Sequence, residues 1–116
     1  MDLAQLNLAV KSVERVSVVE AEGELGPWTN EALGKALHSA AGSDCETVIL
    51  DLTQVKSMDV GALKVLKEVC AALGPDRRLC AIACGDARRL LELTRFDEMI
   101  SVYPRISDAI ETGTVT

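Results

Sequence analysis

The sequence has few aromatic residues, one histidine and an excess of acidic side chains. Trp28, Phe96 and Tyr103 are the only aromatic residues among 116, and 18 Asp and Glu against 12 Lys and Arg give a formal charge of −6. Proteins that bind nucleic acid neutralise phosphates with basic side chains and stack aromatic rings on bases. The composition therefore excludes a typical nucleic-acid binder, and the negative charge disfavours docking on an anionic membrane.

The four cysteines show no metal-binding or disulfide pattern. The sequence has no CxxC pair, and His38 is the only histidine that could complete a zinc site. Cys80 and Cys84 fall on one expected strand, roughly 13 Å apart, whereas a disulfide needs Cα atoms within about 7 Å. We expect four reduced thiols, no metal, no cofactor and a cytosolic protein.

Long apolar runs are also missing. The first ten residues, MDLAQLNLAV, have no basic segment before an apolar stretch, so we expect no signal peptide. No run reaches the roughly 20 apolar residues of a membrane-spanning helix. A length of 116 residues, of which 48% are apolar, fits one domain over 1–116 with its core at about 6–112.

The apolar residues that are present follow strand and helix periodicities in turn. Strands are predicted over residues 6–10, 16–21, 47–52, 79–84 and 100–103. The first two are close enough for an antiparallel hairpin, with a bulge where the phase changes at Val18 and Val19. The almost continuous apolar runs at 47–52 and 79–84 indicate strands covered on both faces, and residues 53–59 are expected to be a loop.

Four helices separate or follow these strands. They are predicted over residues 27–41, 62–73, 87–93 and 108–111. Pro27 fits the first helical position, because the N–H group that proline lacks has no partner there. Periodicity places Leu63 and Leu93 on the inner sides of their helices, and Ser107 is a good cap for the last helix.

This order, β-β-α-β-α-β-α-β-α, predicts a single α/β domain. Strands that alternate with helices are typical of parallel sheets with right-handed crossovers. We therefore expect a mixed, mostly parallel sheet of about five strands with an N-terminal antiparallel hairpin and about four helices.

The residue types needed for catalysis do not occur together. His38, the only imidazole base, lies on the polar side of a helix and is expected to be solvated. Asp51, at the end of a buried strand, is placed like the phosphorylated aspartate of a receiver domain, but no acidic pair follows the first strand to hold Mg²⁺. We expect Asp51 to accept a hydrogen bond from a nearby backbone N–H, and we expect no enzymatic activity.

Asp59 stands where a loop enters a helix. Its carboxylate can accept hydrogen bonds from the free N–H groups of the first turn and complement the helix dipole. Ser57 could do the same one turn earlier. On physical grounds alone, residues 57–59 are therefore the start of a helix.

The segment around Asp59 also resembles STAS domains, and particularly the bacterial anti-sigma factor antagonists. These proteins have a strand of the type V-hydrophobic-D-L and then hydrophobic-D-S-[ST]-G-L, and the corresponding residues here are 48–52 and 58–63. Further segments match the family in order at 18–25, 88–97 and 102–110. The resemblance implies a STAS fold for nearly the whole chain.

What the resemblance implies is a binding module that acts as a switch. Family antagonists bind an anti-sigma factor that is also an ATP-dependent serine kinase, and so free the sigma factor. The kinase inactivates the antagonist by phosphorylating the serine after the motif aspartate, which adds about two negative charges. The implied partner-binding residues at the start of the second helix are Ser57, Met58, Asp59, Val60, Gly61, Leu63 and Lys64.

The sequence departs from the family at the phosphorylation site. Val60 occupies the acceptor position and Gly61 follows it, and neither side chain can accept a phosphate. Gly26 replaces the aspartate that the family usually has after its G-E-L turn. We expect the phospho-switch to be absent or altered, with Ser57 as a weak candidate for a replacement acceptor.

Two functions fit this resemblance. The first is a cytosolic antagonist that binds an anti-sigma factor and so regulates sigma-factor-dependent transcription without contacting nucleic acid. The second is a STAS scaffold that cannot be phosphorylated, either in a stress-signalling complex or in a lipid-transport ABC system. Both are compatible with a homo-oligomer and with no direct membrane insertion.

Overall fold

Strands and helices alternate along residues 6–42 and 45–109, which the computed structural model describes. The elements in chain order are β1 (Leu6–Val13), β2 (Val16–Leu25), α1 (Asn30–Ala41), β3 (Thr47–Met58), α2 (Val60–Leu73), β4 (Arg78–Ile82), α3 (Gly85–Leu93), the 3₁₀ turn η1 (Phe96–Glu98) and β5 (Ser101–Tyr103). A further helical turn covers 106–109. None of the helices in these ranges is long and apolar enough to cross a membrane.

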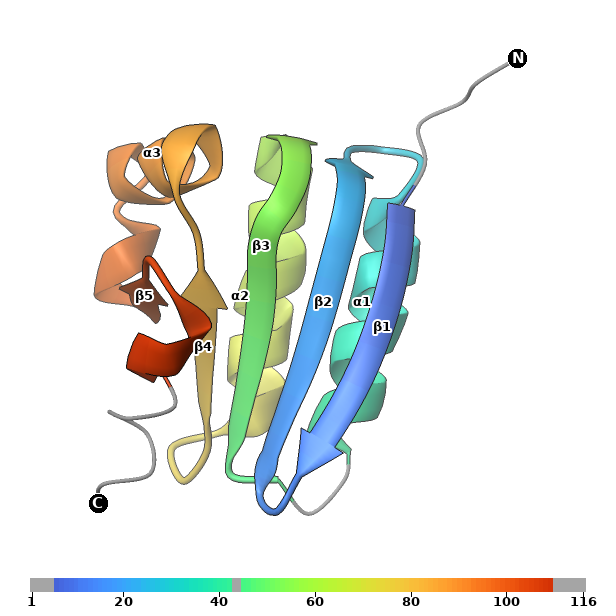
Figure 1. Cartoon of the computed structure of the whole chain (residues 1–116), viewed down its shortest axis with the longest axis vertical. Helices are drawn as coiled ribbons and strands as arrows, with labels where there is room; N and C mark the ends of the chain where they lie inside the picture. Colours follow the sequence, from blue (N-terminus) through green and yellow to red (C-terminus); the bar gives the residue numbers. More distant parts are fainter. Residues whose placement is uncertain (1–5, 43–44, 110–116) are drawn as a thin grey trace.

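The five strands form one sheet in the order β1-β2-β3-β4-β5 (Figure 1). β1 and β2 are antiparallel, and every other neighbouring pair is parallel. The predicted α/β class and mixed sheet with an N-terminal hairpin are therefore confirmed. Receiver domains have the strand order 2-1-3-4-5, so this fold contradicts the receiver alternative for Asp51.

The two faces of the sheet are covered very differently. α1 and α2 pack behind β1–β3 and enclose the main core, which includes Leu37, Leu50 and Leu66. On the other face the 106–109 turn covers a small cluster that contains Ile49 and Cys80, and no other helix of the described residues lies over that face (Figure 1). β3 and β4 are thus buried on both sides in part of their length, which explains their continuous apolar sequences.

β3 is longer than the sequence predicts. Residues 53–58 were expected to be a loop, but they continue the strand and pair with β2 as far as Leu25 and Met58. The register between β2 and β3 shifts twice, between Glu20 and Glu22 and between Gly23 and Glu24. These irregularities break the alternation of apolar and polar residues and so hide the strand. The bulge expected at Val18 and Val19 is wrong, because β1 and β2 pair there without interruption.

The helix boundaries also differ from the prediction. α1 begins at Asn30 and not at Pro27, because residues 26–29 form a turn closed by hydrogen bonds. Leu93, expected to face inward, is 77% exposed at the end of α3. Ser107 is not a helix cap, since the last helical turn already includes residue 106. The expected continuation of this helix lies outside the described residues.

The four cysteines are free thiols, as predicted, and they differ in accessibility. Cys45 and Cys80 are buried, Cys70 is half-buried, and Cys84 is exposed beyond the end of β4, not on the strand as expected. Burial raises the pKa of the Cys70 and Cys80 thiols, although Arg78 acts in the opposite direction on Cys80.

We expect Cys84 to react first when the native protein is treated with a maleimide at neutral pH. The thiolate is the reactive form, so a raised pKa slows Cys70 and Cys80, and burial also protects Cys45 and Cys80 from the reagent. Peptide mapping by mass spectrometry measures the order of labelling, and Cys84→Ser should remove the fast phase. Rapid labelling of Cys80 in the native protein would contradict the packing described above.

Candidate functional site at the start of α2

Asp59 caps α2, as the sequence predicts. Its backbone is extended, and its carboxylate accepts a hydrogen bond from the N–H of Ala62 at 3.1 Å. Replacing such a cap by alanine typically costs about 0.5–2 kcal/mol of stability. Ser57 does not share this role, because it is an exposed residue of β3.

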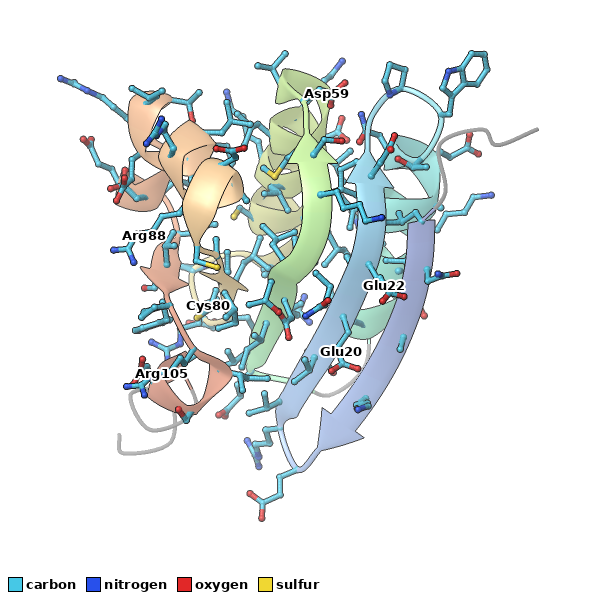
Figure 2. All side chains as sticks on the ribbon, turned by 45° about the horizontal axis from the view of Figure 1, so that its top comes forward. Glu20, Glu22, Asp59, Cys80, Arg88 and Arg105 are labelled. Atoms are coloured by element: carbon cyan, nitrogen blue, oxygen red, sulfur yellow. The ribbon has the colours of Figure 1, made fainter. Side chains whose placement is uncertain are left out.

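The same aspartate connects three elements of the fold. Asn30, the first residue of α1, donates its side-chain N–H to Asp59 Oδ1 at 3.3 Å. The backbone N–H of Asp59 donates to the carbonyl of Leu25, the last residue of β2, at 3.1 Å. Figure 2 shows Asp59 at the end of β3, where the chain leaves the sheet and α2 begins. The start of α2 is therefore fixed against both β2 and α1.

Gly61 leaves the space that this contact requires. A Cβ atom at position 61 would lie 2.7 Å from Asn30 Nδ2 and 3.2 Å from Asp59 Oδ1. The first distance is too short for a side chain unless Asn30 moves, and the second is tight enough that Asp59 would have to shift slightly. The absence of a side chain at position 61 is thus part of how Asn30 reaches Asp59.

The predicted partner-binding residues fall into three groups by exposure. Val60 is 69% exposed, and Ser57 and Lys64 are also exposed, while Met58, Asp59 and Gly61 are half-buried. Leu63 is only 8% exposed and belongs to the main core. Its side chain therefore stabilises the fold and offers almost no surface to a partner.

A tryptophan beside these residues was missed in the sequence. Trp28 lies in the turn between β2 and α1 and is 83% exposed. The turn is held by Thr29, whose Oγ1 accepts from the N–H of Gly26 at 2.9 Å and donates to the carbonyl of Glu24 at 2.7 Å. Because Thr29 is buried and bonded in this way, it holds the backbone of the turn that carries Trp28.

A shallow cavity joins this turn to the start of α2. It has a volume of about 300 Å³, and Pro27, Trp28, Met58 and Asp59 are among the residues that line it.

Periodicity gave no role to Trp28, because a helix that begins at Pro27 would place this residue in a regular first turn. The available signal was that the single tryptophan follows a Gly-Pro pair next to the family's G-E-L turn.

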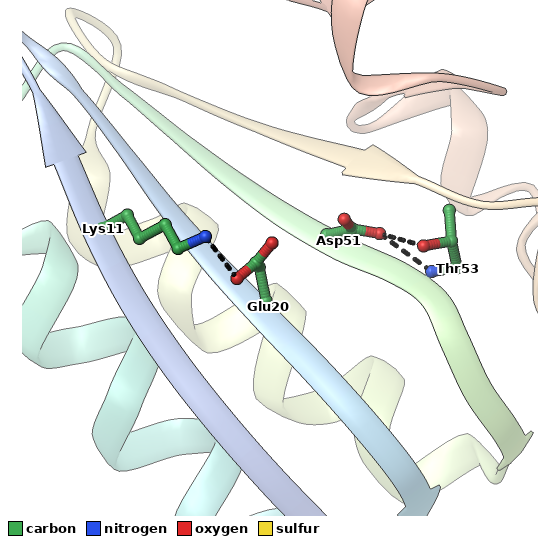
Figure 3. Close-up of polar contacts among 4 residues, drawn as sticks. All are labelled: Lys11, Glu20, Asp51 and Thr53. Carbon is green, nitrogen blue, oxygen red and sulfur yellow. Dashed lines mark hydrogen bonds and ion pairs between the residues drawn. The ribbon is translucent and has the colours of Figure 1, made fainter.

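The carboxylates on the open face of the sheet have local partners (Figure 3). Asp51 accepts hydrogen bonds from the N–H of Thr53 at 2.9 Å and its hydroxyl at 2.7 Å, which confirms the predicted backbone contact. Glu20 forms an ion pair with Lys11 at 3.2 Å. In residues 6–42 and 45–109, no three His, Cys, Asp or Glu side chains are grouped to hold a metal ion. His38 is exposed on α1, as expected.

Sequence and structure comparisons identify the family to which this fold belongs. The profile of the STAS domain matches residues 7–109, which is most of the chain. The chain belongs to the STAS domain family. A crystal structure of an anti-sigma factor antagonist from Mycobacterium paratuberculosis is 28% identical, with a TM-score of 0.88 and coverage of 93% of each chain.

Two more distant structures share the fold of this STAS domain. A putative anti-sigma factor antagonist from Thermotoga maritima is 21% identical, with a TM-score of 0.78, over 90% of this chain and 92% of the other. The antagonist SpoIIAA in its unphosphorylated form is 16% identical, with a TM-score of 0.74, over 95% and 100%. No curated protein matches the sequence significantly. The predicted STAS fold is therefore confirmed, and the chain resembles anti-sigma factor antagonists.

The contact between Gly61 and Asn30 can be tested by a double-mutant cycle. Gly61→Ala gains up to about 1 kcal/mol of helix propensity, but it displaces the Asn30 amide from Asp59, and a lost hydrogen bond typically costs about 0.5–1.5 kcal/mol, so we expect little net change in stability. In an Asn30→Ala background the obstructing amide is absent, and the same change should become stabilising. Urea unfolding of the four proteins measures the coupling. Additive effects would contradict the close contact.

Proposed function

We propose that this STAS domain binds an anti-sigma factor of the serine-kinase ATPase type and so regulates sigma-factor-dependent transcription. On this proposal the protein acts by binding in the cytosol and catalyses no reaction. The main support is its likeness, over 93% of the chain, to the anti-sigma factor antagonist from Mycobacterium paratuberculosis.

We assign the docking surface to the start of α2 together with the preceding turn. It consists of Trp28, Ser57, Met58, Asp59, Val60, Gly61 and Lys64. Val60 and Trp28 expose large apolar side chains to solvent, and tryptophan is enriched among residues that dominate binding energy. The hydrogen bonds of Thr29 and Asp59 hold the backbone of both segments in place, so little backbone entropy is lost on binding.

The proposal also states how binding is regulated. In the family the acceptor serine precedes a Ser or Thr, and here these positions are Val60 and Gly61. A valine cannot carry a phosphate, so association with the partner would not be switched off at this position. Val60 would instead contribute an apolar contact where relatives have a hydroxyl group.

A scaffold role is the second candidate, and the same observation favours it. A STAS subunit of a stress-signalling complex or of a lipid-transport system has no need of an acceptor, as at Val60. Affinity purification from the native host with mass spectrometry separates the two functions. Recovery of a kinase-type anti-sigma factor supports the first, whereas recovery of transporter subunits without such a factor would refute it.

We expect Trp28→Ala to weaken binding of the purified partner strongly. Residues that dominate an interface typically contribute about 2 kcal/mol or more, which corresponds to roughly thirtyfold in Kd. Isothermal titration calorimetry measures the change, and Val60→Lys should also weaken binding by placing a charge in the apolar surface.

The matched control for these variants is Met99→Ala. Met99 is also an exposed apolar residue, at 52%. It precedes β5, whereas α2 follows β3, and these strands run parallel, so Met99 lies near the opposite end of the strands. Its Kd should equal that of the parent protein. Equal binding by Trp28→Ala and the parent would remove Trp28 from the docking surface.

A gain of function tests the missing switch. Incubated with the anti-sigma factor and ATP, Val60→Ser should acquire a phosphate that the parent protein does not take up. Intact-mass and peptide mass spectrometry detect it, with Val60→Ala as the control without a hydroxyl. Phosphorylation of the parent at Ser57 would show that a replacement switch exists.

A further inference from the structure

The two edges of the sheet are built differently. β5 at one edge has only three residues, and very short edge strands are one way in which proteins prevent unwanted pairing. β1 at the other edge has eight residues and pairs with β2 in an unbroken register from Leu6 to Val13. In an antiparallel pair alternate residues bond to the neighbouring strand, so half of the N–H and C=O groups of β1 point away from β2.

The β1 edge lacks most of the features that prevent pairing. Its sequence, LNLAVKSV, contains no proline, and its pairing with β2 shows no bulge. Lys11 is its only charged residue, and this ammonium group lies 3.2 Å from Glu20 of the neighbouring strand (Figure 3). The charge is thereby directed toward β2 and away from the free edge. Long, regular and weakly charged edges of this kind are templates for another strand.

Apolar side chains of β1 remain exposed to solvent on the side of the sheet that the helices cover. Val10 is paired with Val19, and the two lie on the helix-covered side of the sheet. Val19 is fully buried, whereas Val10 is 48% exposed. Leu6 and Leu8, on the same side, are only partly buried against the core. The main core therefore reaches the β1 edge and ends there with apolar side chains still in contact with water.

We propose that β1 pairs antiparallel with β1 of a second copy, so that two domains share one continuous ten-stranded sheet. A two-fold axis at Ala9 places Val10 opposite the partner's Leu8 and Lys11 opposite the partner's Asn7. The apolar pair extends each core across the interface. A centre at Lys11 would set two ammonium groups opposite each other, which is unfavourable.

The sequence of β1 is complementary to itself in this register, because Val10 faces Leu8 and Lys11 faces Asn7, so we assign a second copy as the occupant. The two-fold arrangement is closed, because each edge is used once and no free β1 edge remains. The smallest side chain of the strand, Ala9, lies on the axis. The start of α2 follows β3, which β2 separates from β1, so this interface is distinct from the part of the docking surface that α2 carries.

Analytical ultracentrifugation over a wide concentration range tests the proposal. We expect a concentration-dependent species of twice the 12.4 kDa of one chain. Val10→Lys places a charge that opposes strand pairing at the β1 edge. It should make the protein monomeric at concentrations at which the parent is dimeric. Val60→Lys is the matched control, since it makes the same change at another exposed valine and should leave the dimer intact.

Asn7→Lys tests the register without endangering the fold. Asn7 is exposed and its amide donates to Glu22 at 3.3 Å, so a lysine there retains an acidic neighbour within the monomer. Across the proposed interface the new lysine faces the partner's Lys11. We expect weaker dimerisation and unchanged stability of the monomer by thermal unfolding at low concentration.

Hydrogen exchange locates the interface directly. The backbone amides of 6–12 should become more protected as the parent concentration rises, and those of β5 should not. A parent protein that stays monomeric at its highest soluble concentration would overturn the proposal. So would a dimer that leaves β1 unprotected, or one that Val10→Lys and Asn7→Lys leave unchanged.

Discussion

The parallel pairing of β2 and β3 determines where the candidate site can exist. These strands stay together from Val16 and Thr47 to Leu25 and Met58. The ends of the two strands are therefore adjacent, although Leu25 and Met58 are 33 positions apart in the sequence. The turn that carries Trp28 and the start of α2 lie side by side for this reason.

The hydrogen bonds around Asp59 convert that proximity into a rigid surface. The Leu25 carbonyl receives the Asp59 N–H, and the Asn30 amide reaches the Asp59 carboxylate. Each bond connects a different element to the first turn of α2. Because Asn30 occupies the space beside Gly61, the departure from the family motif involves more than a lost hydroxyl group. Restoring serine at position 60 supplies an acceptor but leaves this local packing as it is.

Sequence patterns predicted the parts of the fold that depend on local chemistry. The hairpin, the buried strands and the Asp59 cap follow from alternation, continuous apolar runs and helix-start chemistry. The extension of β3 to Met58 was missed because two register shifts disturb its alternation. The start of α1 was missed because the hydroxyl of Thr29 closes the preceding turn through contacts that sequence periodicity does not report.

Leu63 shows how the two kinds of sequence argument differ. Helical periodicity placed it on the inner side of its helix, whereas the family motif placed it among partner-binding residues. Its 8% exposure agrees with periodicity. A family motif contains both the residues that a partner contacts and those that keep the helix in place. Burial distinguishes the residues that hold the helix from those that a partner can reach. Trp28 lies outside the motif, and its exposure was seen only in the structure.

The excess negative charge also affects where this domain can associate. Glu20, Glu22 and Asp51 lie on the face of the sheet that α1 and α2 do not cover (Figures 2 and 3). Carboxylates on both partners would repel each other if two such faces were stacked. Large apolar side chains are exposed elsewhere: Val10 at the β1 edge, Trp28 and Val60 beside the start of α2, Leu93 at the end of α3, and Met99 before β5. The acidic face thus disfavours one mode of self-association, and both proposed interfaces lie away from it.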